Sequence, residues 1–209
     1  MKSKLISFTL IASIIMSFAG VNFSTTSAAE STTWTKNIEI STDTLNGVAY
    51  GADIMVAVGD NGLIRTSVDG EKWNYLSSPA ANNLKDVAYG EGMFVACGDS
   101  GTILSSKDGV TWSQAKTNTK YGLSTVIFDK SRFIAVGDQG ILLVSYDGIE
   151  WKVLGTSIND NFTDICKCKD LYVIGGFNGL YISKDLKEWK HFKDSEYYLI
   201  KTIVYDGKK

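Results

Sequence analysis

Short apolar runs separated by glycine-rich turns fill residues 30–209, and no segment there repeats its hydrophobic residues with the period of a helix. Four runs are apolar at successive positions, as in strands buried on both faces: "IMVAVG" (54–59), "MFVACG" (93–98), "RFIAVG" (132–137) and "LYVIGG" (171–176). A shorter run precedes each of them, at 47–51, 86–90, 125–129 and 164–168. The pattern predicts an all-β protein.

The runs belong to a repeat. Trp34, Trp73, Trp112, Trp151 and Trp189 lie 39, 39, 39 and 38 residues apart, and glycines 59, 98, 137 and 176 keep the same register. Four antiparallel strands, here called a to d, fit in each unit of this length, which is typical of a β-propeller blade. We therefore predict four full blades, at about 47–80, 86–119, 125–158 and 164–194.

Residue size varies along each unit as a propeller requires. Small residues such as Ala49, Gly51, Ala88 and Gly90 lie in strand a, the innermost strand, and the tryptophans begin strand d, the outermost. We expect the tryptophans to pack as wedges between neighbouring blades.

Two further segments resemble single strands, a strand d at 34–40 and a strand a at 202–206. These two segments would share one blade, but that blade has no strands b and c. We therefore consider three arrangements of the ring. The chain is part of a longer propeller, or four or five blades close the ring with irregular terminal strands, or two copies assemble.

An aspartate precedes the tryptophan in each unit, as in "TSVDGEKW" (66–73). Asp-Gly between strands c and d is a strong hairpin signal, because both central residues of the turn can take positive φ. The carboxylate can also accept hydrogen bonds from N–H groups of its own turn. We interpret Asp69, Asp108, Asp147 and Asp185 as structural, and expect the fourth turn to relax, since Leu186 follows its aspartate.

The start of the chain predicts export. Lys2 and Lys4 precede an apolar run from Leu5 to about Val21, and small residues stand before Glu30. We interpret 1–29 as a secretory signal peptide and 30–209 as the propeller, with an uncleaved membrane anchor as the alternative. The predicted location is secreted, extracellular or in the cell envelope, with no membrane contact after cleavage.

Charge argues against a nucleic-acid partner. Residues 30–209 carry 19 basic and 23 acidic side chains, a net charge of −4, and Arg65 and Arg132 are the only arginines. Binding to phosphate backbones depends on clustered lysine and arginine, which is not found here.

The cysteines predict neither a disulfide framework nor a metal centre. Cys97 stands where other repeats have valine, so we expect a buried thiol. Cys166 and Cys168 lie two residues apart on one face of a predicted strand, a spacing that does not favour an unstrained mutual disulfide. A metal would need further ligands, and His191 is the only histidine. We predict no cofactor and no metal.

Loops differ most on the face that holds the b–c turns and the d–a connections, and variable loops on a repeated scaffold are where binding specificity usually lies. We hypothesise a ligand-binding face there, formed by Asp60, Asp99, Asp138, Asn178, Tyr121, Asn161, Tyr197 and Tyr198. The alternatives are that the aspartates only form the turns, or that they bind calcium, which takes about six to eight oxygen ligands.

Through Ser67, Asp69, Gly70 and Trp73, and Ser106, Asp108, Gly109 and Trp112, the chain resembles the BNR or Asp-box β-propeller repeats. The turn is one residue shorter than the pattern of that family, Ser/Thr-x-Asp-x-Gly-x-Thr-Trp. The resemblance extends to secreted bacterial surface proteins, photosystem II assembly and stability factors, and sialidases. For sialidases it implies an arginine triad, which two arginines cannot supply, and for the assembly factors an arginine-rich partner surface.

We therefore predict a non-catalytic binding or scaffold module whose loop face takes a protein or carbohydrate ligand. A glycan-processing hydrolase of the sialidase type is the alternative. Self-assembly is a further option if the ring is incomplete.

Overall fold

The computed structural model describes residues 43–192 and 199–207. The predicted signal peptide at 1–29, the predicted strand at 34–40, and Tyr197 and Tyr198 lie outside these ranges. The described residues form four antiparallel sheets of four strands each, and the strands of every sheet follow chain order. The predicted all-β propeller architecture is confirmed.

The strands of blades 1 and 2 match the apolar runs of the sequence. Blade 1 contains β1 (Leu45–Gly51), β2 (Ile54–Gly59), β3 (Ile64–Ser67) and β4 (Asn74–Leu76). Blade 2 contains β5 (Leu84–Gly90), β6 (Met93–Gly98), β7 (Ile103–Ser106) and β8 (Ser113–Gln114).

Blades 3 and 4 repeat this order. Blade 3 contains β9 (Leu123–Asp129), β10 (Arg132–Gly137), β11 (Leu142–Ser145) and β12 (Lys152–Leu154). Blade 4 contains β13 (Phe162–Cys168), β14 (Leu171–Gly176), β15 (Gly179–Ser183) and β16 (Lys190–Phe192). Short 3₁₀ turns join strands b and c in the first three blades: η1 (Asp60–Gly62), η2 (Asp99–Gly101) and η3 (Asp138–Gly140).

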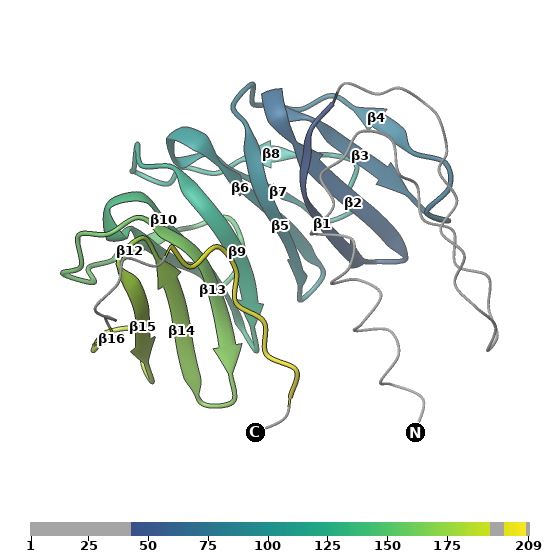
Figure 1. The fold of residues 1–209 in the computed structure, drawn as a ribbon. Coiled ribbons are helices and arrows are strands. Elements are labelled where there is room, and N and C mark those ends of the chain that lie inside the picture. The colour runs from purple at the N-terminus through teal and green to yellow at the C-terminus, as the bar shows by residue number, and fades with distance from the viewer. Residues whose placement is uncertain (1–42, 193–198, 208–209) are drawn as a thin grey trace.

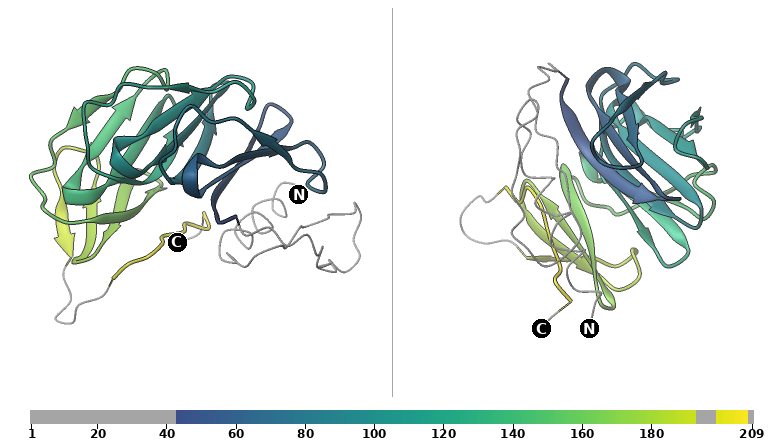
Figure 2. Two further views of the ribbon diagram at one scale, coloured as in Figure 1. Left: turned by 90° about the horizontal axis from the view of Figure 1, so that it is seen from above. Right: turned by 90° about the vertical axis from the view of Figure 1, so that its right-hand side faces the viewer.

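The blades lie side by side along a curved row, with blade 1 at one end and blade 4 at the other (Figures 1 and 2). The first strands are neighbours along the row, because β1 packs on β5, β5 on β9 and β9 on β13. This packing makes strand a the innermost strand of each blade. Among the described residues no helix is long and apolar enough to cross a bilayer.

The hydrophobic core lies between the blades. Val56 and Ile64 of blade 1 pack with Phe94 of blade 2, and Trp112, which directly precedes β8, belongs to the same cluster. Trp151 is in the cluster that joins blades 2 and 3, and Trp189 packs against the cluster that joins blades 3 and 4. The predicted wedge role is therefore confirmed for Trp112, Trp151 and Trp189, whereas Trp73 is in none of these clusters and Trp34 lies outside the described residues.

Glycines in strand a make room for aromatic rings of the next blade. A Cβ atom at Gly51 would lie 2.1 Å from Cγ of Tyr89, and one at Gly90 would lie 2.0 Å from Cγ of Phe128. The third junction differs, because Asp129 stands at the glycine position and pairs with Lys167, with 4.0 Å between Oδ2 and Nζ. The small residues of strand a thus set the spacing of the first two junctions.

A buried carboxylate joins neighbouring innermost strands. Asp86 on β5 accepts hydrogen bonds from Thr125 Oγ1 (2.7 Å) and Val126 N (3.0 Å) on β9. Asp164 on β13 makes the same bonds to Thr202 Oγ1 (3.0 Å) and Ile203 N (2.7 Å). Residues 199–207 therefore lie against β13 as β9 lies against β5 (Figure 1, yellow).

The strand predicted at 202–206 does not form, because no described segment supplies a strand b to pair with it. The segment is held instead by Asp164 and by contact between Ile200 and Gly175, where a Cβ atom would lie 2.6 Å from Ile200 Cγ2.

Candidate functional site

The Asp-Gly turns form the predicted hydrogen bonds from their own N–H groups to the carboxylate, but not the predicted backbone conformation. In each blade the serine Oγ accepts from the N–H three residues later, and one aspartate oxygen accepts two further N–H groups, as Asp108 Oδ1 does from Val110 (2.8 Å) and Thr111 (2.7 Å). Only the residue after the aspartate has positive φ, 73° at Gly109. The predicted turn with two positive φ values is wrong, because the side-chain bonds close the turn without it.

The fourth turn keeps this pattern. Leu186 takes a φ of 66°, its N–H donates to Ser183 Oγ (2.9 Å), and its side chain is fully buried in the core of blades 3 and 4. The prediction that this turn relaxes was wrong, because burial of leucine offsets the strain of positive φ.

These four carboxylates serve the turns. The N–H groups of Thr111 and Val110 lower the pKa of Asp108 from 3.8 to about 2, and the equivalent amides lower the pKa of Asp69, Asp147 and Asp185. With the a–b turns they form one end of the blades, here called the turn face. The b–c turns and the d–a connections form the opposite end, here called the loop face.

On the loop face the b–c turns are fixed by the segment that precedes each blade. Asp60 N donates to Thr44 O (3.0 Å), Asp99 N to Asn83 O (2.9 Å) and Asp138 N to Gly122 O (2.9 Å). Positive φ falls on the next residues, Asn61, Ser100 and Gln139, and then on glycine. Backbone bonds thus hold these turns, and the three aspartate side chains take no part in them.

A one-residue bulge in strand a directs a side chain toward these aspartates. The register shifts at the same place in every strand a, and the extra residues are Asn46, Lys85, Ser124 and Thr163. Asn46 Nδ2 donates to Asp60 Oδ1 (2.9 Å), and Lys85 Nζ lies 3.6 Å from Asp99 Oδ2. The pairs hold the first two carboxylates in place at the inner rim of the loop face.

The second and third carboxylates come close together around Gly122. A Cβ atom at Gly122 would lie 2.7 Å from Asp138 Oδ2 and 3.9 Å from Asp99 Oδ1. Within the described part of the chain the Asp138 carboxylate has no hydrogen-bond or ion-pair partner. All three aspartates are half-buried, so an acidic row crosses blades 1 to 3.

Two predicted site residues have clear structural roles. Asn161 Oδ1 accepts from Gln139 N (3.0 Å) and so caps the b–c turn of blade 3. Asn178 donates from its backbone N and from Nδ2 to the buried carboxylate of Asp160, at 3.0 and 2.8 Å. Asn178 is exposed, but these bonds fix its position. Both asparagines lie on the loop face.

Asp160 holds several residues of blade 4 together. The sequence does not single it out, because it stands in a loop without a repeated motif. It also accepts from Tyr181 OH (2.9 Å), and the Tyr181 ring stacks on His191 at 4.4 Å between centroids. Burial and the hydrogen bond to Asp160 raise the pKa of Tyr181. Tyr121, in contrast, is 41% exposed on the loop between blades 2 and 3.

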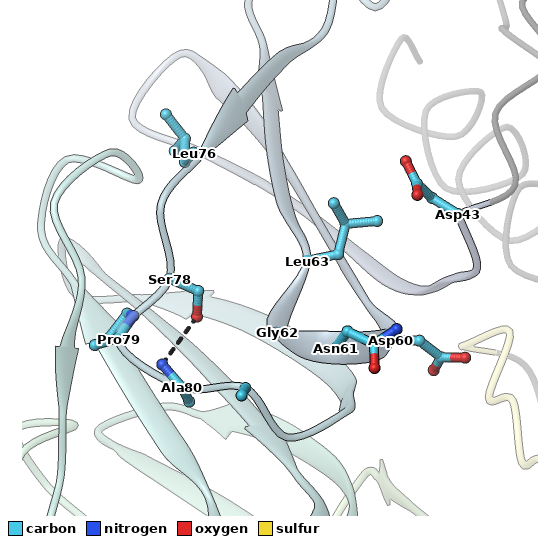
Figure 3. A pocket seen from close by; sticks show the side chains of 10 residues that line it. Asp43, Asp60, Asn61, Gly62, Leu63, Leu76, Ser78, Pro79 and Ala80 are labelled. Atoms are coloured by element: carbon cyan, nitrogen blue, oxygen red, sulfur yellow. Dashed lines mark hydrogen bonds between the residues drawn. The ribbon is translucent and has the colours of Figure 1, made fainter.

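An open groove of about 550 Å³ lies at the blade 1 end of the acidic row (Figure 3). Its walls are the b–c turn Asp60–Gly62 with Leu63, and the d–a connection from Leu76 to Ala81. Ser78 Oγ accepts from Ala80 N (3.2 Å), which fixes the bend of that connection. Two carboxylates line the groove, Asp60 at the end of the acidic row and Asp43, which is paired with Arg65.

The two arginines lie in separate clusters. Arg65 pairs with Asp43 at 2.6 Å and lies over the Tyr75 ring in blade 1, whereas Arg132 donates to Tyr172 OH (2.6 Å) at the junction of blades 3 and 4. Within residues 43–192 and 199–207, no three His, Cys, Asp or Glu side chains come together in a way that could hold a metal ion.

Solved structures similar to this fold include YCF48 bound to D1 peptide (TM-score 0.63, 14% identity, covering 77% of this chain and 57% of that chain). YCF48 from Cyanidioschyzon merolae is also similar, with a TM-score of 0.59 and 17% identity, covering 77% of this chain and 60% of that chain. The nidogen/laminin complex has a TM-score of 0.60 and 12% identity, covering 78% of this chain and 70% of that chain. This chain spans about three fifths of the length of the YCF48 structures.

No curated protein matches the sequence significantly. The family model for the DUF6242 beta propeller domain does match, over residues 28–166, which is more than half of the chain. The repeat, the four-stranded blades and this match lead to one conclusion: the chain belongs to the DUF6242 beta propeller domain family.

Proposed function

We propose that this chain is a non-catalytic protein-binding module whose loop face binds an extended peptide segment carrying lysine or arginine. The observation that carries the proposal is the acidic row, in which Asp60, Asp99 and Asp138 occupy one position in three successive blades. A row of like charges on rigid turns attracts a chain of opposite charge and orients it.

The geometry of the row supports a cationic ligand. Asp99 and Asp138 approach each other around Gly122, and Lys85 is the one cation paired with the row within the described residues. Two neighbouring carboxylates repel each other, so a bound cationic side chain would relieve that repulsion. The groove beside Asp60 would take a neighbouring residue of the same peptide.

Similar folds support the choice of a polypeptide ligand. One similar structure is YCF48 bound to D1 peptide and another is a nidogen/laminin complex, so propellers of comparable shape do hold peptides or proteins. A carbohydrate ligand has no such support, and it stays an alternative for the test below.

The arginine positions argue against the sialidase alternative. Arg65 and Arg132 lie in blade 1 and at the junction of blades 3 and 4, and each already contacts a tyrosine. A grip on a substrate carboxylate needs arginines that converge. We also propose that the module is secreted or in the cell envelope, on the grounds of the signal peptide expected at 1–29.

The test compares two labelled synthetic peptides of equal length, one alternating lysine with serine and the other alternating glutamate with serine. Fluorescence anisotropy should detect binding of the lysine peptide only, weakened by added salt. The triple variant Asp60→Asn, Asp99→Asn, Asp138→Asn should lower the affinity about tenfold to 100-fold, because each ion pair contributes roughly 0.5–1 kcal/mol.

A matched control removes equal charge from the turn face, with Asp53→Asn, Asp170→Asn and Glu150→Gln. This variant should bind as the wild type does. If both variants weakened peptide binding equally, the effect would come from net charge alone. A site on the loop face would then be refuted. Binding of neutral glycans that the lysine peptide fails to displace would favour the carbohydrate alternative.

A further inference from the structure

Cys166 and Cys168 form a close thiol pair on β13, the innermost strand of blade 4. Residues two apart in a strand share a face, and the two Sγ atoms lie 3.7 Å apart. Both thiols are free and half-buried. The equivalent residues are Ala88 and Gly90 in blade 2 and Ile127 and Asp129 in blade 3, so no other full blade has a thiol at either position.

The separation of the two sulfur atoms suits a metal ligand pair. A tetrahedral ion with metal–sulfur bonds of about 2.3 Å holds two thiolates about 3.8 Å apart. The observed distance of 3.7 Å is therefore close to what such an ion needs, with little movement of β13. A disulfide would require the sulfur atoms to approach to about 2.05 Å.

The ligand type also favours a soft cation, because thiolates select soft metals over magnesium or calcium. Both cysteines are only half-buried, so the pair is not sealed from solvent.

We propose that Cys166 and Cys168 together bind one soft, thiophilic divalent cation. Binding forms two metal–sulfur bonds, breaks the two S–H bonds and releases two protons to solvent, without any change of oxidation state. Since no third His, Cys, Asp or Glu among the described residues completes the site, the remaining coordination positions stay open to water or to an incoming ligand.

Cadmium is the probe. The full chain is first reduced, the reductant is removed, and Cd²⁺ is then added. The thiolate-to-cadmium absorption band should appear with one Cd²⁺ per chain, and Zn²⁺ should reverse it by competition. Thiol titration of the folded protein should find Cys166 and Cys168 reactive before addition and protected afterwards, while Cys97 stays buried throughout.

The variants Cys166→Ser and Cys168→Ser should each lower the affinity for Cd²⁺ about 100-fold or more, because a single thiolate cannot chelate. The variant Cys97→Ser is the matched control, since Cys97 is fully buried between blades, and it should bind Cd²⁺ like the wild type. Loss of the band in Cys97→Ser, binding that survives in Cys166→Ser, or a disulfide between Cys166 and Cys168 under these conditions would each overturn the proposal.

Discussion

Leu186 illustrates how one residue combines two opposing effects. Its φ of 66° lies in the region that favours glycine, and the first three blades have glycine at this position. Its side chain is fully buried and packs between blades 3 and 4. Since the turn keeps its hydrogen bonds, core packing outweighs the strain at this residue.

We expect Leu186→Ala to lower the free energy of unfolding by about 2–5 kcal/mol, because it empties a core position and keeps the strained φ. Leu186→Gly should be about 1 kcal/mol more stable than Leu186→Ala, since glycine relieves the strain. Urea unfolding of the three proteins measures both differences. A glycine variant less stable than the alanine variant would show that φ contributes nothing here.

At the scale of elements, contacts between successive strands a determine how the blades pack. Gly51 and Gly90 receive aromatic rings, whereas Asp129 and Lys167 replace this contact at the third junction with an ion pair. The hydroxyl of Tyr172, which is fully buried, bridges Arg132 and Asp129 at the same junction. At the position of Gly51 and Gly90, the third junction therefore has a polar contact where the first two have an aromatic ring.

The variant Gly90→Ala should be destabilised by about 1–3 kcal/mol or more, because its Cβ atom would overlap the Phe128 ring. Gly155→Ala is the control, since a Cβ atom at that position meets no atom within 4 Å. The midpoints of thermal unfolding of the two variants should differ by several degrees. Equal midpoints would mean that the blades shift to admit the methyl group at no cost.

The sequence predicted strand b of every blade to the residue, because its apolar runs end at repeated glycines. It also predicted the wedges at Trp112, Trp151 and Trp189 and the turn aspartates. It did not predict the bulge at Asn46 and Lys85 or the bonds of Asp86 to β9, because these contacts join residues that are far apart in the chain and share no local motif. The sequence predicted the residues of the acidic row, but only the structure shows that Asp99 and Asp138 lie close together around Gly122.

At the scale of the whole molecule, the two ends of the row of blades differ from its middle. Leu45 of β1 is 38% exposed, whereas its counterparts Leu84 and Leu123 are 0% and 1% exposed. Val204 at the other end is 56% exposed. Only the inner blades are covered on both sides by described residues, so most of the buried surface belongs to them.

Stability of the whole molecule should depend on pH through Asp86. Burial raises the pKa of Asp86 from 3.8 to about 6, against hydrogen bonds from Thr125 and Val126 that lower it. Between these values the folded state holds a proton that the unfolded state has lost, so the contribution of Asp86 to stability falls as the pH rises from about 4 to 6.

The variant Asp86→Asn should remove this slope. The difference in unfolding free energy between wild type and variant, measured by urea titration at several pH values, should therefore change between pH 4 and about 6 and stay constant above pH 7. A difference that is independent of pH would contradict a titrating carboxylate at this position. Below pH 4 both proteins should lose stability, since the turn aspartates with lowered pKa become protonated there.

The chain order of the strands within each sheet has a consequence for how the protein is made. Every described blade is one uninterrupted stretch of chain, and blades 2, 3 and 4 each share a core with the blade before them. A blade leaving the ribosome can therefore pack at once on the blade already formed, without waiting for a distant segment. Synthesis from the N-terminus would then build the row blade by blade, in the order in which the blades stand.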